Sequence, residues 1–244
     1  MAGDAASITS SPIATVEAIS APSALAALAD LFRQVWGASE PLVHVDLLRA
    51  VGYTGGYVVG AYDTGGQLVG GSFGFLADHA GERALHSHVT GILPGVQHAG
   101  VGRLIKDHQR TWAAERGIGW ITWTFDPLVR RNAWFNIEVL GAEVAEYVVD
   151  FYGEMRDPVN HGSASDRLMM AWPSVPAEPA ARKLIGRRVE VATPDDIVVL
   201  RRTDPAAASD WRARVRAELG GPLAAGARVV GFTRSGSYVL DVPA

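Results

Sequence analysis

A glycine-rich turn between a strand-like run and an amphipathic helix carries the clearest chemical pattern in this sequence. Upstream, apolar and polar residues interleave over Leu85–Leu93, which is typical of a strand. Downstream, apolar residues recur at helical spacing from Val101 to Trp112. The turn itself, Gln97–Gly102, has little side-chain bulk, so the first N–H groups of the helix and its dipole face outward. This pattern indicates an anion site, and phosphate is the usual anion.

The spacing excludes two common phosphate loops. The turn lacks the Gly-Lys-Ser/Thr ending of a P-loop and the Gly-x-Gly-x-x-Gly spacing of dinucleotide-binding folds. A turn that only caps and packs a helix explains the residues as well. The remaining motif resembles the acyl-CoA loop of the GNAT family of N-acetyltransferases, Gln/Arg-x-x-Gly-x-Gly/Ala. Gln97, Gly100 and Gly102 occupy those places, and Pro94 stands three residues before Gln97.

The resemblance implies an acyl-CoA cosubstrate, with its pyrophosphate on the turn and its pantetheine arm along the preceding strand. A shorter stretch, Asn132-Ala133 with Phe135-Asn136, is similar to an uncharacterised subgroup of predicted acetyltransferases. Some relatives of that subgroup resemble N-succinyltransferases that act on amino acids. The implied cofactor-binding residues are Thr90, Gly91, Ile92, Gln97, His98, Ala99, Gly100, Val101, Gly102, Asn132 and Phe135.

Acyl transfer to an amine needs a base that deprotonates the ammonium. His86 and His88 are the leading candidates, because they lie on the strand expected to hold the thioester and an ordinary histidine has a pKa of about 6.5. Because side chains alternate between the two faces of a strand, His86, His88 and Thr90 are expected to lie on the same face. Hydrogen-bonded interior histidines explain the pattern as well. Asp126 is the rival base: it ends a strand where open α/β sheets place ligands, although an Asp before Pro is also an ordinary turn residue.

The general acid implied by the resemblance does not carry over. The family has a tyrosine four residues before the glycine that corresponds to Gly141, and this sequence has Ile137 there. Tyr147, Tyr152 or a water must then protonate the leaving thiolate, or the thiolate leaves unprotonated. The absence of cysteine excludes a Cys-acyl intermediate and favours direct attack in a ternary complex.

Four residues are candidates for the acceptor pocket. Trp123 and Asn136 are expected to line it, although Trp123 also fits a core position. Asp166 and Arg167 are expected to hold the charged ends of an amino-acid substrate, since arginine binds a carboxylate in a bidentate manner. A structural ion pair explains Asp166-Arg167 equally well.

Composition narrows the function classes. The 244 residues are 48% hydrophobic and 20% charged, with a net charge of −4 and a pI near 6.0. A sizeable core is therefore expected, and a nucleic-acid-binding surface is not. Disulfides and cysteine-based zinc sites are excluded, and no metal site is expected. No secretory signal or apolar run of about 20 residues is present, so we expect a soluble cytoplasmic protein without membrane contact.

The expected fold is mixed α/β, with a GNAT-like, mostly antiparallel central sheet, flanking helices and a small α+β C-terminal extension. The expected divisions are a disordered tail (1–13), an acyl-CoA-binding domain (14–173), a linker (174–184) and an extension (185–244) packed on the core or on a second subunit. Within the extension, Ile197–Arg201 is expected to be a strand. Four charged residues are expected on the solvent face of the helix after the glycine turn: Arg103, Lys106, Asp107 and Arg110.

These observations predict an N-acyltransferase that moves an acetyl or succinyl group from acyl-CoA to the amine of a small molecule, with an amino acid as one candidate. A homodimer is one expected assembly. The alternative function is a catalytically degenerate acyl-CoA sensor that regulates a partner, and the missing tyrosine is its chief support.

Overall fold

The computed structural model describes residues 13–96, 100–153, 164–176 and 186–243. Gln97, His98 and Ala99, most of the expected tail and most of the expected linker lie outside these residues. The chain divides into two compact units. The first unit comprises Met1–Phe75 and Ser87–Gln109, and the second comprises Leu76–His86 and Arg110–Ala244.

Seven strands form the larger sheet, in the order β1-β2-β3-β4-β5-β7-β6. The β4–β5 pair is parallel, and the pairs β1–β2, β2–β3, β5–β7 and β6–β7 are antiparallel. This is the mixed, mostly antiparallel sheet that the sequence predicts. The strands are β1 (Ile13–Ala18), β2 (Tyr57–Asp63), β3 (Leu68–His79), β4 (Glu82–Ile92), β5 (Trp120–Phe125), β6 (Glu143–Val148) and β7 (Arg167–Pro173).

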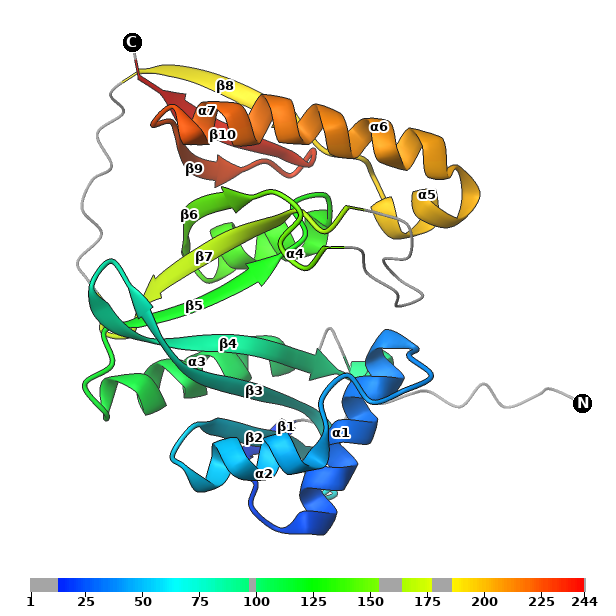
Figure 1. Ribbon diagram of the computed structural model, residues 1–244, viewed down its shortest axis with the longest axis vertical. Coiled ribbons are helices and arrows are strands. Elements are labelled where there is room, and N and C mark those ends of the chain that lie inside the picture. The colour runs from blue at the N-terminus through cyan, green and yellow to red at the C-terminus, as the bar shows by residue number, and fades with distance from the viewer. Residues whose placement is uncertain (1–12, 97–99, 154–163, 177–185, 244) are drawn as a thin grey trace, which may run out of the picture. The chain divides into compact units, whose positions relative to one another are not determined.

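In the first unit, helices cover both faces of the strands (Figure 1). Helices α1 (Pro22–Trp36) and α2 (Val45–Tyr53) bury leucines and Phe32 against Val58 and Phe73 of β2 and β3. The opposite face packs on α3 (Val101–Ala114), whose Val101 and Ile105 meet Ala61. Burial of these apolar side chains holds β2, β3 and the second half of β4 between two helical layers.

Glycine in β3 serves helix packing. A Cβ at Gly71 would lie 2.3 Å from Leu28 Cδ1 and 2.7 Å from the Val59 carbonyl oxygen. The missing side chain at Gly71 therefore allows α1 to approach β3 closely.

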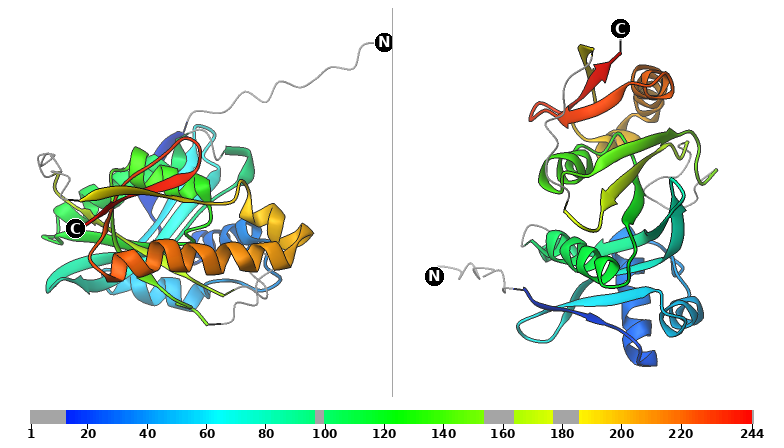
Figure 2. Two further views of the ribbon diagram at one scale, coloured as in Figure 1. Left: turned by 90° about the horizontal axis from the view of Figure 1, so that it is seen from above. Right: turned by 90° about the vertical axis from the view of Figure 1, so that its left-hand side faces the viewer.

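In the second unit, β5, β7 and β6 carry α4 (Arg130–Trp134), which continues as a π-helical turn over Phe135–Val139. A three-stranded sheet follows in the order β8-β10-β9, and α6 runs along it (Figure 2). Its elements are β8 (Arg187–Ala192), α5 (Ile197–Thr203), α6 (Pro205–Val215), a π-helical turn (Arg216–Gly220), α7 (Gly221–Ala224), β9 (Arg228–Phe232) and β10 (Ser237–Val242).

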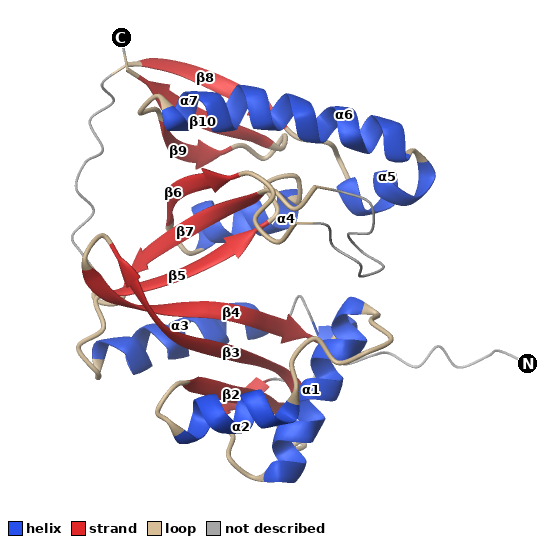
Figure 3. Ribbon diagram, in the orientation of Figure 1, coloured by secondary structure: helices blue, strands red, loops and turns tan. Residues whose placement is uncertain are grey.

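The segment expected as a strand at Ile197–Arg201 is helix α5, so that prediction is wrong (Figure 3). The β-branched run Ile-Val-Val favours a strand, but the Asp196 side chain accepts hydrogen bonds from the N–H groups of Val198 and Val199 and starts a helix. Elsewhere, α2 begins at Val45, and a tight turn at Ala80-Gly81 joins β3 to β4. No helix in the described ranges is long and apolar enough to cross a bilayer.

Candidate functional site

A local irregularity interrupts β4 in the first unit. The ring of His88 packs on Phe73, and Val89 joins the same apolar cluster under α1 and α2. The hydroxyls of Ser87 and Thr90 approach each other to 3.4 Å on the opposite face. His88 and Val89 are consecutive in the sequence but lie on the same face of the strand, which is the signature of a β-bulge. The expectation that Thr90 shares a face with the histidines is therefore wrong, because the bulge shifts the alternation by one residue.

The face bearing Ser87 and Thr90 carries a buried network of hydrogen bonds. Gln109 Nε2 donates to Ser72 Oγ (2.9 Å) and to Ser87 Oγ (2.8 Å). Lys106 Nζ donates to Ser87 Oγ at 3.2 Å, and the Ser72 and Thr90 hydroxyls lie 2.9 Å apart. Ser72 Oγ also donates to the Val89 carbonyl oxygen (2.9 Å). We call these five side chains, Ser72, Ser87, Thr90, Lys106 and Gln109, the hydroxyl–lysine network.

Lys106 is buried, contrary to its expected place on the solvent face of α3. Burial lowers the pKa of Lys106 from 10.5 to about 7, because a low-dielectric surrounding disfavours the ammonium. The inner face of α3 is wider than the apolar positions suggest, since Lys106 and Gln109 lie next to Ile105 on it. In the sequence, the i, i+3 spacing of Lys106 and Gln109 was the one indication that both side chains lie on the same face of the helix.

The turn into α3 is partly described. Gly100 has a φ of +83°, a conformation that favours glycine, and its carbonyl oxygen accepts from Leu104 N. Val101 is buried and Gly102 half-buried. On the strand before the turn, Thr90 and Ile92 are half-buried, and a Cβ at Gly91 would lie 2.9 Å from the Phe32 ring.

The two candidate histidines have different surroundings. In the first unit, His88 contacts the rings of Phe73 and Phe75, and partial burial lowers its pKa. In the second unit, His86 Nδ1 lies 3.0 Å from Thr122 Oγ1 on β5. In the tautomer whose Nδ1 donates to Thr122, Nε2 is the nitrogen that can take a proton.

One face of β5 continues from His86 to a tyrosine. Thr124 is two residues beyond Thr122, so both lie on the same strand face. The exposed Tyr152 places its hydroxyl 3.4 Å from Thr124 Oγ1. His86 and Tyr152 therefore border the same row of β5 threonines within the second unit.

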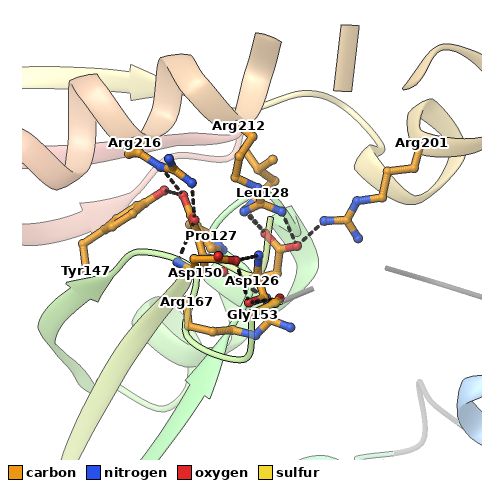
Figure 4. Close-up of polar contacts among 12 residues, drawn as sticks. Asp126, Pro127, Leu128, Tyr147, Asp150, Gly153, Arg167, Arg201, Arg212 and Arg216 are labelled. Carbon is orange, nitrogen blue, oxygen red and sulfur yellow. Dashed lines mark hydrogen bonds and ion pairs between the residues drawn. The ribbon is translucent and has the colours of Figure 1, made fainter. Parts of the chain in front are cut away.

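Asp126 is surrounded by arginines (Figure 4). Arg212 donates to both carboxylate oxygens at 2.7 Å, and Arg201 also bonds to Oδ2. Burial raises the pKa of this carboxyl, but the guanidinium bonds and charges outweigh it and lower the pKa to about 2. Asp126 also caps the turn that follows β5, accepting from Leu128 N. A carboxylate held in this way is a poor proton acceptor near neutral pH.

Asp166 forms a second ion pair close by. Arg216 donates to it at 2.6 and 2.9 Å, and the Tyr147 hydroxyl donates to Oδ2 at 2.7 Å. Burial and the Asp166 charge raise the pKa of Tyr147. Asp126, Asp166, Arg201, Arg212 and Arg216 together are called the carboxylate–arginine cluster. Each pair joins the 126–166 segment to the C-terminal helices, within the second unit.

Other contacts tie the C-terminal extension to the same segment. The buried Tyr238 hydroxyl donates to the Pro127 carbonyl oxygen at 2.7 Å. Glu138 accepts a hydrogen bond from Phe232 N at 2.7 Å. These hydrogen bonds and the ion pairs of the carboxylate–arginine cluster join the extension to the rest of the second unit.

The remaining expected site residues lie in the second unit. Trp123 and Asn136 are both buried, and Trp123 Nε1 donates to Asn136 Oδ1 at 3.2 Å. Arg167 is also buried, with its guanidinium 5.2 Å from the centre of the Tyr152 ring and donating to the Asp166 carbonyl oxygen. Two half-buried residues of α4 and the following π-helical turn complete the set, Asn132 and Phe135.

No protein-family model and no curated protein matches this sequence significantly. The structure is similar to several solved acetyltransferases. With aminoglycoside 6'-acetyltransferase type Ii it shares 15% identity at a TM-score of 0.53, over 68% of this chain and 100% of the other. With Naa20 of Chaetomium thermophilum it shares 19% identity at a TM-score of 0.52, over 66% of this chain and 86% of the other. With the ribosomal-protein-S18-alanine N-acetyltransferase of Escherichia coli it shares 15% identity at a TM-score of 0.50, over 68% of this chain and 97% of the other.

At these identities the likeness concerns the path of the chain. The described chain therefore has the GNAT acetyltransferase fold.

Proposed function

We propose that this protein is an acyl-CoA N-acyltransferase that moves an acetyl or succinyl group to the amine of a small molecule. The observation that carries the proposal is the bulge in β4 just before Thr90–Ile92, in a fold shared with solved acetyltransferases. A bulge takes backbone groups out of the strand ladder, so that an extended ligand can pair with them. The pantetheine arm of acyl-CoA is such a ligand.

The helix that follows the bulge supports the placement of the pyrophosphate. The N–H groups at the start of α3 and the helix dipole favour an anion, and the left-handed Gly100 leaves no Cβ in its way. A backbone N–H near Thr90 would stabilise negative charge on the thioester oxygen.

His86 is the base in this proposal. Its bond to Thr122 fixes the ring, and a histidine accepts a proton from an ammonium near neutral pH. His88 is a weaker candidate, because its ring packs on two phenylalanines. The arginine bonds favour a structural role for Asp126, and the mutual hydrogen bond favours one for Trp123 and Asn136.

An amino acid is the acceptor class favoured by the second unit. Arg167, placed over the ring of the exposed Tyr152, would hold the acceptor carboxylate, and Asp166 is committed to Arg216. The solved structures with this fold acetylate an aminoglycoside and a ribosomal-protein alanine, so the fold serves small and large amines.

Calorimetric titration with acetyl-CoA and succinyl-CoA, followed by thiol release over a panel of amino acids and other amines, tests the proposal. Gly100→Asp should weaken acyl-CoA binding by about tenfold or more, because it strains the turn and adds a negative charge. Gly117→Asp is the matched control, since Gly117 also has a positive φ (+61°) but lies after the C-terminal end of α3, whereas Gly100 lies just before its start. Equal loss of binding in both variants, or none in either, would contradict the proposed site.

The second candidate function is an acyl-CoA sensor without turnover. Ile137, in the π-helical turn where the resemblance implies a tyrosine acid, favours it. Tight binding of acyl-CoA with no thiol release on any amine would select the sensor.

A further inference from the structure

We propose that Lys106 delivers a proton, through the hydroxyls of Ser87 and Thr90, to the sulfur that leaves acyl-CoA. The inference rests on the proposed function and assigns the acid that Ile137 cannot supply. Its geometric basis is the hydroxyl–lysine network, which leads from a buried amine on α3 to Thr90 on the strand where the pantetheine arm is proposed to pair.

The direction of the hydrogen bonds follows from the number of protons that each group can give. Ser72 gives its hydroxyl proton to the Val89 carbonyl oxygen, so Thr90 must donate to Ser72. Ser87 accepts from Lys106 and from Gln109, so its own proton points to Thr90. The chain of donors therefore runs from Lys106 to Ser87 and on to Thr90.

The steps in this chain are 3.2 Å from Lys106 to Ser87 and 3.4 Å from Ser87 to Thr90. The second step is long for two hydroxyls, and catalytic hydrogen bonds commonly tighten when substrate binds. Ser87 and Thr90, the two residues of β4 in this chain, both carry a hydroxyl group. A hydroxyl group can accept one proton while it passes on another.

The lysine is suited to the task because it can lose its proton near neutral pH. Burial lowers the pKa of Lys106 to about 7, and an acid works best when its pKa lies near the working pH. The other charged and titratable groups on the neighbouring elements have contacts of their own. They are Asp107 with Arg103 (2.8 Å), His108 with Tyr57 of β2 (2.8 Å), and His88 with Phe73 and Phe75.

The proton balance of the step is complete. The amine nitrogen forms a bond to the thioester carbon, and the carbon–sulfur bond breaks with its electron pair on sulfur. When acyl-CoA is bound, the Thr90 hydroxyl turns its proton from Ser72 to that sulfur and gives it up. Ser87 then replaces the proton on Thr90, and Lys106 replaces it on Ser87. Lys106 becomes neutral and regains a proton from solvent, while the general base takes the proton that the amine loses.

Lys106→Met is the main test, because methionine fills similar space and carries no proton. The wild-type protein should show kcat falling as pH rises above about 7, as Lys106 loses its proton. The variant should lose that alkaline fall and have kcat at pH 7 lower by about 100-fold. Its acyl-CoA affinity should stay within about twofold, and Ser87→Ala and Thr90→Val should reproduce the same profile.

Three comparison variants separate a proton role from a structural one. Lys106→Arg keeps a positive charge but cannot release a proton, so it should be as slow as Lys106→Met. Gln109→Leu removes a neutral neighbour of Ser87 and should keep the alkaline fall. Tyr152→Phe should keep it as well. An unchanged profile in Lys106→Met, or its loss in Tyr152→Phe alone, would overturn the proposal.

The sequence offers a direct measurement that needs no turnover. It contains two lysines, Lys106 and Lys183. Lysine labelled with ¹³C at the ε-carbon should give two NMR signals, and Lys183→Arg identifies the signal of Lys106. We expect that signal to titrate near pH 7, and titration near 10 would overturn the proposal. If wild-type protein binds no acyl-CoA or acylates no amine, the proposed function fails, whereas turnover with an unchanged Lys106→Met profile removes the relay alone.

Discussion

The two units each bury a polar group of side chains, and the two groups are built in opposite ways. In the first unit, the hydroxyl–lysine network bonds a buried amine to the neutral Ser87 hydroxyl, and burial lowers the pKa of that amine to about 7. In the second, the carboxylate–arginine cluster surrounds Asp126 with guanidiniums, and its pKa is lowered to about 2. One group can change its charge near neutral pH, and the other is fixed.

The difference shows that burial of an ionisable group does not by itself mark a catalytic residue. A carboxylate with bidentate arginine contacts holds two segments together, since its ionised form is the stable one. A buried amine that bonds a neutral hydroxyl is costly for the fold, and a function near neutral pH explains that cost.

Of the changes that test this comparison, Asp126→Ala should have the largest effect on the stability of the protein. The substitution leaves Arg201 and Arg212 buried without the carboxylate they share, so we expect the free energy of unfolding to fall by about 3–5 kcal/mol. Urea denaturation measures it. Asp195→Ala is the control: that carboxylate pairs with Arg130 but is 95% exposed, so its loss should cost less than about 1 kcal/mol. Similar costs in the two variants would contradict a buried structural role for Asp126.

Acid should destabilise the protein through the same carboxylate. The folded-state pKa of about 2 lies below the ordinary 3.8, so the folded state binds fewer protons in that range. The stabilising contribution is complete above pH 4 and is lost as pH falls from about 4 to 2, by about 2 kcal/mol. Urea denaturation at a series of pH values measures this slope, and in Asp126→Asn it should be shallower.

Lys106→Met should change stability in the opposite direction. Removing an amine that is costly to bury should raise the free energy of unfolding by about 1–2 kcal/mol at neutral pH. The wild-type value should also rise between pH 7 and about 10, because the unfolded state holds its proton over that range and the folded state does not. Thermal and urea denaturation of the wild-type protein and the variant at a series of pH values test both expectations. A destabilised variant would show that the ammonium is held by favourable contacts.

Ser72→Ala should have the smallest effect of the four. Ser72 is fully buried and donates to the Val89 carbonyl oxygen at the bulge, so its loss should cost about 1 kcal/mol. The pKa of Lys106, followed by NMR, should stay near 7, because Ser72 does not contact the amine. Ser235→Ala, at an exposed hydroxyl that pairs with Thr233, is the control and should be neutral within about 0.5 kcal/mol.

Much of the fold could be predicted from local patterns. Alternating and helical periodicity placed most strands and helices, and the resemblance around Gln97–Gly102 supplied the class of sheet. Helix α5 was missed because three β-branched residues outweighed the cap at Asp196, whose effect depends on one side-chain rotamer.

The candidate site was less predictable, because its parts depend on tertiary contacts. One bulge moved Thr90 away from the face of the histidines, and no periodicity reveals a single extra residue. Lys106 has the sequence context of a surface residue, and Asp126 that of a turn residue. Their environments come from side chains up to 86 positions away in the sequence, as in the Asp126–Arg212 pair.

The ion pairs of the second unit also bear on the order in which the chain can fold during its synthesis. Asp126 and Asp166 leave the ribosome before Arg201, Arg212 and Arg216, whereas every residue of the first unit precedes Arg110. The first unit can therefore form while translation continues. The segment around Asp126 must keep its carboxylates hydrated until the three arginines have been synthesised, so the second unit can complete its core only after Arg216 has left the ribosome.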